Sequence, residues 1–172
     1  MIKRLAGQHA ARAKDQRYGA EYNFGATYYD ARDEAIRRGD RKIGTEHMVL
    51  ALLIDPASPA ARALGCDLGA ARGALDALDN QALAAIGVEP GITAGPVLVR
   101  TGGRLRLTPA AKAIFTGIPD ARRNRQAGLG KVLNALLDLR RSDPAAELLA
   151  ALAVDVPAAR QRFAEFDQEP RP

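Results

Sequence analysis

The feature that most constrains this chain is a motif that occurs twice. The first copy, residues 43–54, reads Ile-Gly-Thr-Glu-His-Met-Val-Leu-Ala-Leu-Leu-Ile, and the second, residues 127–137, reads Ala-Gly-Leu-Gly-Lys-Val-Leu-Asn-Ala-Leu-Leu. In both copies a glycine precedes apolar residues at helical spacing, and both contain Ala-Leu-Leu near the end. A helix with an apolar face must bury that face, so each copy predicts the central helix of one of two related units.

The sequence that follows each motif is repeated as well. Ser58-Pro59-Ala60-Ala61 follows the first copy and Asp143-Pro144-Ala145-Ala146 follows the second. In each, a capping residue precedes proline at the first helical position, where the missing N–H costs nothing. Residues 64–72 then align with residues 152–160, and the second copy is longer between these landmarks by about one helical turn. Two units of short helices that share one core are therefore expected.

These residues resemble a known family. Gly44-Thr45-Glu46-His47 before an apolar helix, then Ala60-Ala61-Arg62 and Leu64-Gly65-Cys66-Asp67, is similar to the Clp N-terminal (Clp R) domain. Domains of that family are tandem four-helix repeats at the front of Clp-type AAA+ unfoldases. The resemblance covers roughly residues 21–166 and implies an all-α fold with pseudo-twofold symmetry, in a stand-alone copy without AAA+ modules. The second repeat keeps Leu107-Thr108-Pro109 but lacks the Thr-Glu-His signature.

The expected organisation follows from this alignment. We expect a basic N-terminal arm, a first repeat, a connector, a second repeat and a disordered tail, at about residues 1–20, 21–87, 88–106, 107–166 and 167–172. In the connector, Val97-Leu98-Val99-Arg100 and Arg104-Leu105-Arg106-Leu107 flank Thr101-Gly102-Gly103, which predicts a small β-hairpin. Such a hairpin needs support from the helices.

Local signals place several helix ends. Gly39-Asp40 should end the first helix near Arg38, and Thr45 should cap the central helix of the first repeat. Asp67 and Thr108 are further expected caps. In the second repeat the glycine pair predicts a helix start that brings Lys131 into the first turn, where its charge opposes the helix dipole.

Composition narrows the class of protein. The chain has 172 residues, enough for one or two small domains, and no apolar run approaches the ~20 residues of a membrane span. No signal peptide is apparent. The single cysteine, Cys66, excludes an internal disulfide and is typical of a reducing cytosol, so we expect a cytoplasmic protein in which Cys66 is a small core residue.

Catalytic and metal-binding patterns are weak. Two histidines, His9 and His47, with one cysteine do not make a convincing zinc site, and no Gly-x-Ser-x-Gly elbow occurs. Residues 128–131, Gly-Leu-Gly-Lys, suggest a phosphate loop, but Arg125 replaces its first glycine and Val132 replaces its metal-binding Ser or Thr. We therefore expect no catalytic residues, no metal and no cofactor, and a protein that is not an enzyme.

The net charge of +5 is unevenly distributed. The first basic segment is the N-terminal arm, which has one acidic residue, Asp15, and five basic ones: Lys3, Arg4, Arg12, Lys14 and Arg17. The second runs from Arg100 to Lys131 and contains a single acidic residue, Asp120. Such surfaces can bind nucleic acid or anionic peptides. A nucleic-acid-binding protein that uses these two segments therefore remains the alternative, beside the reading that they are solvated surface.

The resemblance implies a function. N-terminal domains of the family bind adaptor proteins and, in some members, phosphoarginine on substrates, where the Glu of Gly-Thr-Glu-His receives the guanidinium. The resemblance therefore implies that Thr45, Glu46 and His47 bind the ligand, and that free N–H groups at the start of the helix hold its phosphate. The other interpretation of Glu46 is a carboxylate that only complements the helix dipole.

We expect a protein- or peptide-binding module, chaperone-related and active in the regulation of proteolysis. It would act as an adaptor, a decoy or a sequestering protein. The expected partner is an adaptor, a Clp substrate or a Clp unfoldase, and no membrane is involved.

The incomplete phosphate loop gives a first prediction. Purified protein should neither bind nor hydrolyse ATP, so its melting temperature should be the same with and without Mg-ATP. A ligand that binds only the native state must raise the melting temperature, and a nucleotide-dependent rise would contradict the prediction.

Overall fold

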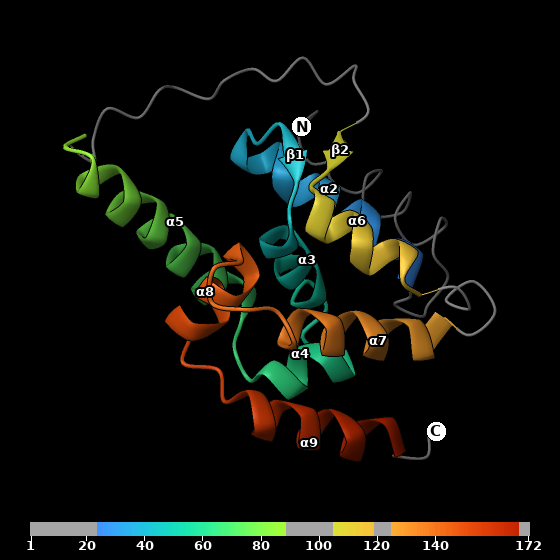
Figure 1. Ribbon diagram of the computed structural model, residues 1–172. Helices are drawn as coiled ribbons and strands as arrows, with labels where there is room; N and C mark the ends of the chain where they lie inside the picture. Colours follow the sequence, from blue (N-terminus) through green and yellow to red (C-terminus); the bar gives the residue numbers. More distant parts are fainter. Residues whose placement is uncertain (1–23, 89–104, 119–124, 169–172) are drawn as a thin grey trace, which may run out of the picture.

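The computed structural model describes residues 24–88, 105–118 and 125–168. Within these ranges the chain is helical apart from one very small sheet, which confirms the predicted all-α class (Figure 1). The predicted N-terminal arm, the first strand of the predicted hairpin and most of the predicted tail lie outside the described residues.

Within the described residues, each repeat contributes four helices. Those of the first repeat are α2 (Phe24–Arg38), α3 (Thr45–Leu52), α4 (Pro59–Leu64) and α5 (Leu68–Ala85). Those of the second repeat are α6 (Pro109–Thr116), α7 (Arg125–Leu137), α8 (Pro144–Ala151) and α9 (Val156–Gln168). The predicted pair of four-helix repeats is thus confirmed.

The predicted capping residues begin four of these helices. Asp67 Oδ1 accepts the Ala70 N–H at 2.8 Å, and Ser58 Oγ accepts the Ala61 N–H at 3.1 Å. Thr108 and Asp143 cap α6 and α8 in the same way. Each cap satisfies a backbone donor that the helix itself leaves unpaired, which fixes where the helix begins.

The repeats also match at a backbone detail. Gly65 follows α4 with φ +69°, and Ala153, at the aligned position after α8, has φ +53°. Ala153 is the one non-glycine residue with positive φ among the described residues, a conformation that L side chains rarely adopt. Both repeats therefore use the same left-handed turn to direct the chain into their last helix.

Two expected helix starts are wrong. Gly44, not Thr45, is the N-cap of α3, and Thr45 is its first helical residue. In the second repeat α7 begins at Arg125, so Gly128 and Lys131 lie within the helix and not at its start. Glycine is only mildly unfavourable inside a helix, and here the apolar face of α7 keeps the helix continuous through it.

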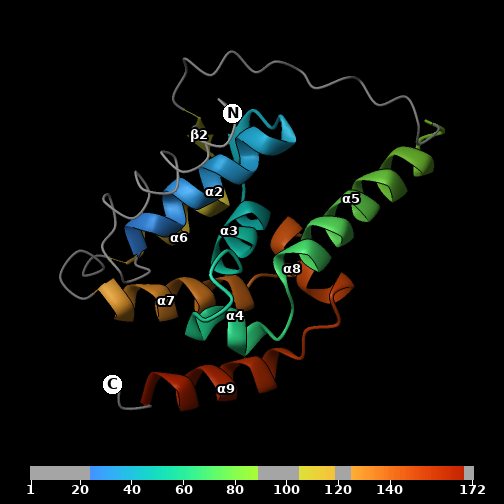
Figure 2. The same ribbon diagram turned by 180° about the vertical axis from the view of Figure 1, so that it is seen from behind.

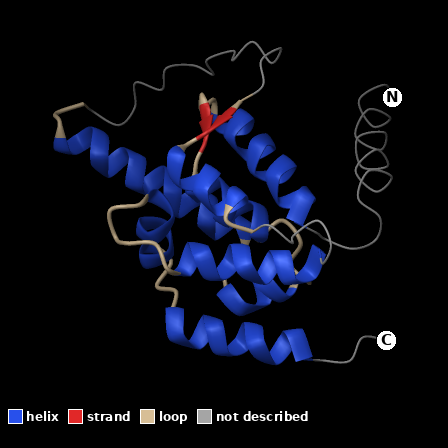
Figure 3. Cartoon of the chain, turned by 45° about the vertical axis from the view of Figure 1, so that its right-hand side comes forward, coloured by secondary structure: helices blue, strands red, loops and turns tan. Residues whose placement is uncertain are grey.

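A two-stranded parallel sheet joins the segment before α3 to the segment before α6 (Figure 3). β1 (Lys42–Ile43) pairs with β2 (Arg106–Leu107) in parallel, and the Thr108 N–H extends the contact to the Ile43 carbonyl at 2.9 Å. β2 lies within the predicted second hairpin strand, but its partner β1 was not predicted. A strand of two residues is too short to show an alternating sequence pattern, and its pairing depends on how the two repeats pack, so sequence alone could not predict β1.

The repeats are interlocked through their last two helices. α4 packs along α9, and α8 packs against α5, so each repeat covers the other (Figures 1 and 2). The central helix α3 lies between α2 and α8 and also contacts α7. The largest fully buried side chains come from both repeats: Ile43, Met48, Leu50, Leu52, Leu133, Leu136 and Leu148.

This interlocking predicts that neither half folds alone. Cleavage at Gly95 should give fragments that are unfolded separately, because each lacks half of the shared core, and that regain helical structure when mixed. Circular dichroism of the separate and mixed fragments would test this. A cooperatively melting fragment of residues 1–94 would indicate two independent domains.

Candidate functional site

The candidate site lies at the start of α3, where β1 leads into the helix. Gly44 has an extended conformation, with φ −97° and ψ 179°, and no side chain caps the helix from this position. The first N–H groups of α3 therefore carry the positive end of the helix dipole without a side-chain cap. Such a terminus attracts negative charge.

Glu46 supplies negative charge close to this terminus. Its carboxylate folds back over Gly44, so closely that a Cβ atom on Gly44 would lie 2.2 Å from both carboxylate oxygens. A side chain at position 44 would force the Glu46 carboxylate to move. The Glu46 side chain keeps 17% of its surface exposed and is the most exposed of the three predicted ligand-binding residues.

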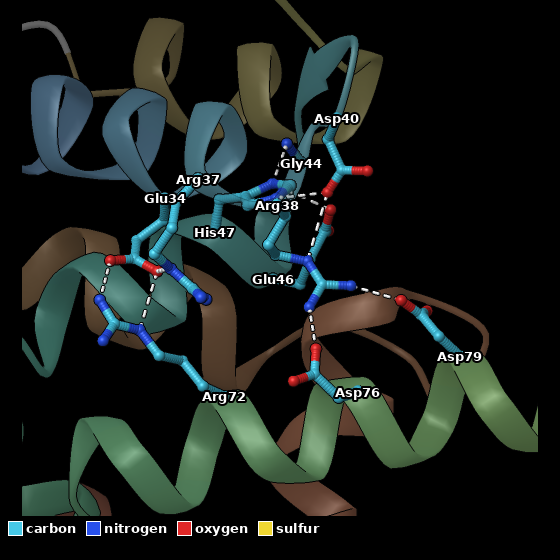
Figure 4. A network of polar contacts seen from close by, with 10 residues as sticks. All are labelled: Glu34, Arg37, Arg38, Asp40, Gly44, Glu46, His47, Arg72, Asp76 and Asp79. Carbon is cyan, nitrogen blue, oxygen red and sulfur yellow. Dashed lines mark hydrogen bonds and ion pairs between the residues drawn. The ribbon is translucent and has the colours of Figure 1, made fainter. Parts of the chain in front are cut away.

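His47 lies beneath Glu46 with only 1% of its surface exposed. Its Nε2 is 2.9 Å from Asp40 Oδ2, and its Nδ1 is 3.0 Å both from the Gly44 nitrogen and from Glu46 Oε1 (Figure 4). The two contacts at Nδ1 exclude one another chemically. The Gly44 N–H needs a lone pair on Nδ1, whereas the Glu46 carboxylate needs a proton there.

The two carboxylates decide the charge of His47. Burial opposes the charged imidazolium, but the hydrogen bonds to Asp40 and Glu46 outweigh burial and raise the pKa of His47 to about 9. The hydrogen bond from His47 in turn lowers the pKa of Asp40. At neutral pH His47 is therefore protonated, and Nδ1–H donates to Glu46.

Arg38 connects this cluster to α5. Its Nε donates to Asp40 Oδ2 at 3.3 Å, its Nη1 to Asp76 at 2.6 Å, and its Nη2 to Asp79 (Figure 4). The Arg38 side chain keeps 11% of its surface exposed, whereas Asp76 and Asp79 keep 63% and 58%, so solvent screens the bonds to α5. Arg38 thus ties the end of α2, the loop before α3 and the middle of α5 into one polar cluster.

A second ion cluster supports the same helices. Glu34, buried on α2, accepts from Arg37 at 2.9 Å and from Arg72 Nε at 3.1 Å (Figure 4). Burial acts to raise the pKa of Glu34, but the two arginines overcome it and hold that pKa below its usual value. Removal of Arg72 would leave a buried carboxylate underpaired, which is costly.

Thr45 joins the site to the second repeat. Its hydroxyl donates to Asp143 Oδ1 at 2.5 Å, and the same oxygen accepts the Ala145 N–H at 3.0 Å. The side chain that was expected to cap α3 therefore supports the cap of α8. Thr45 keeps only 2% of its surface exposed, which makes it part of the interface between the repeats.

The structure brings the three predicted ligand-binding residues together but gives them different surroundings. Glu46 reaches the surface, whereas Thr45 and His47 are buried and bond within the chain. Sequence reasoning missed Arg38 as a partner of this site and treated Asp40 only as part of a helix end. The sequence offers no signal for these contacts, since they depend on how α2, α3 and α5 pack.

The second repeat has no equivalent of Glu46. Leu129 is buried in the aligned place of Thr45, and a Cβ on Gly130 would lie 2.7 Å from the Phe163 ring. Lys131 is exposed within α7. A carboxylate at position 130 would collide with α9, so the second repeat has packing where the first has its candidate site.

Other kinds of site find little support in the part of the chain that the structure describes. It contains no group of three or more His, Cys, Asp or Glu side chains that could hold a metal ion. Nor does it contain a helix that is long and apolar enough to cross a membrane.

Comparison with known families identifies the class of protein. Residues 26–126 match the Clp repeat (R) N-terminal domain, which is more than half of the 172 residues. The chain therefore belongs to this family and is a Clp-related protein-interaction module. A search of curated proteins gave no match.

The surroundings of His47 predict a pH dependence. Its native pKa of about 9 lies above the usual 6.5, so its stabilising contribution is complete below pH 6.5 and is lost as the pH rises toward 9. An NMR titration, with the imidazole signals assigned through His47→Gln, should give a midpoint well above 6.5. Asp40→Asn should lower that midpoint.

The opposite outcome has a clear meaning. A midpoint at or below 6.5 in the wild-type protein would show that His47 is neutral at pH 7. Its Nδ1 would then accept from Gly44, and Glu46 would have no imidazolium partner.

Proposed function

We propose that this protein binds protein or peptide ligands of the Clp system, and that Glu46 is the contact residue of a single phosphoarginine site. The observation that carries the proposal is the position of the Glu46 carboxylate, partly exposed and folded over the N-cap glycine of a helix without a side-chain cap. A guanidinium can pair with this carboxylate while its phosphate meets the helix N–H groups.

In this proposal His47 and Thr45 position Glu46 and do not contact the ligand. His47 holds the carboxylate through Nδ1 and is itself held by Asp40. Thr45 fixes the first turn of α3 against Asp143. An arriving guanidinium would pair with the carboxylate while His47 keeps its contact to Oε1, because a carboxylate can accept several hydrogen bonds.

Binding without catalysis is part of the same proposal. The protein would act on Clp-dependent proteolysis as an adaptor, a decoy or a sequestering protein, and would do so in the cytoplasm, the location expected from its single cysteine. Its partner would be an adaptor, a Clp substrate or a Clp unfoldase. The nucleic-acid alternative depends on basic segments that lie largely outside the described residues.

Titration calorimetry with phosphoarginine tests the site. One molecule should bind per chain, because α7 offers no second carboxylate. Glu46→Ala should weaken binding at least about tenfold, since it removes a charge-assisted hydrogen bond of roughly 1.5–3 kcal/mol.

Glu165→Ala is the control, because Glu165 is an exposed acidic residue on a helix of the second repeat, α9, and belongs to neither proposed binding surface. This variant should bind phosphoarginine as the wild type does. Two sites per chain, or equal affinity in Glu46→Ala, would contradict the proposal, as would the absence of wild-type binding.

A further inference from the structure

A groove runs between α5 and α8. It encloses about 540 Å³ and is lined by Ala74, Ala77, Leu78, Gln81, Arg141, Glu147, Ala150 and Ala151. Alanines make up half of this lining, so the walls are set back and largely apolar. α5 and α8 belong to different repeats, so the groove is a seam between them.

The other half of the molecule contains the equivalent seam, between α4 and α9. The last helices of the two repeats begin in the same way: Asp67 Oδ1 accepts the Ala70 N–H at 2.8 Å, and Asp155 Oδ1 accepts the Ala158 N–H at 3.0 Å. Counted from these caps, Ala74 corresponds to Arg162 and Leu78 to Phe166. Counted from Ser58 and Asp143, which cap α4 and α8, Glu147 corresponds to Arg62.

Large side chains fill the seam between α4 and α9. Arg162 Nε donates to the Ala63 carbonyl at 2.8 Å, which ties α9 to α4. Arg62 lies over the ring of Phe166, with its guanidinium carbon 3.8 Å from the ring centroid, in a cation–π contact. This seam is therefore closed by two guanidinium groups and an aromatic ring.

None of these three groups occurs at the corresponding position between α5 and α8, although Arg141 also lines that groove. Ala74 and Leu78 are smaller than the Arg162 and Phe166 to which they correspond, and Glu147 reverses the charge of Arg62. All three residues line the groove. The groove thus lies where the two repeats differ in sequence. The seam between α4 and α9 shows that guanidinium groups and an aromatic ring can fill a space of this kind.

We propose that the groove between α5 and α8 binds a segment of a partner protein that carries an arginine beside an aromatic side chain. The ring occupies the space over Ala74, Ala77 and Leu78, and the guanidinium pairs with Glu147. This goes beyond the Glu46 site and rests on the proposed function only in that the chain is a protein-interaction module.

The end of α5 beyond the groove is also exposed. From residue 79 to residue 88 every position on α5 and the turn after it is exposed, and α5 leads away from the other helices (Figure 2). Leu83, Ile86 and Val88 in this stretch keep 40%, 75% and 38% of their surface exposed. At about 100° per residue, Leu83 lies on the opposite face of α5 from Ala74, so this apolar surface is separate from the groove.

The test uses two fluorescent alanine-based helical peptides. One carries Arg and Phe four residues apart, the spacing of Arg162 and Phe166, and the other has Glu in place of the Arg. Fluorescence anisotropy with the full chain should show the Arg–Phe peptide binding at least about tenfold more tightly, since the Glu peptide loses one charge-assisted hydrogen bond and faces Glu147.

Two variants locate the binding. Ala74→Arg with Leu78→Phe gives α5 the residues that close the other seam, and should weaken binding of the Arg–Phe peptide at least about tenfold by filling the groove. Glu147→Lys, an exposed change that the fold should tolerate, should cause a similar loss and favour the Glu peptide. Circular dichroism melts establish that both variants fold.

Glu46→Ala separates this inference from the phosphoarginine site, because it should leave binding of the Arg–Phe peptide unchanged. Equal binding of the two peptides, or full binding by a folded Glu147→Lys protein, would overturn the proposal. Sedimentation that shows wild-type dimers, dissociated by the Ala74→Arg, Leu78→Phe double change, would assign the groove to a second copy of this chain instead.

Discussion

The packing of each repeat against the last helices of the other is the constraint on which the structure depends. α4 lies along α9 and α5 lies against α8, so neither repeat can bury the apolar face of its own central helix without its partner. The Thr45 hydroxyl, bonded to the capping carboxylate of α8, sits on this interface. Capping residues set where helices begin, and the left-handed turns at Gly65 and Ala153 set where α4 and α8 end, but packing between the repeats sets how the helices are arranged.

Both surfaces to which we assign binding arise from differences between the repeats. Where α3 begins, Gly44 leaves room for the Glu46 carboxylate, whereas Gly130 at the place that aligns with Glu46 leaves room for Phe163 of α9. Phe166, Arg62 and Arg162 close the seam between α4 and α9, whereas the smaller Leu78 and Ala74 leave a groove between α5 and α8. In each case one repeat uses a position for packing, and the other leaves it accessible to a ligand.

Much of this fold could be predicted from sequence because its signals are local. The repeated motif, the Pro-Ala-Ala starts and the caps at Ser58, Asp67, Thr108 and Asp143 each act within one helical turn. What could not be predicted depends on distant packing: the pairing of β1 with β2, the start of α7 at Arg125 and the surroundings of the site. Glu46 was identified through family resemblance. The role of Arg38, which connects the site to α5, could not be predicted because it depends on how α2, α3 and α5 pack together.

Native-state hydrogen exchange tests the shared core most directly. Amides in the middle of α3, such as Leu50 and Leu52, and amides in the middle of α7, such as Leu133 and Leu136, should exchange with one common free energy. That free energy should equal the free energy of global unfolding, because the core opens only as a whole. If the α7 amides exchange through a separate, lower-energy opening while α3 stays protected, the repeats are independent units and the interlocked account is wrong.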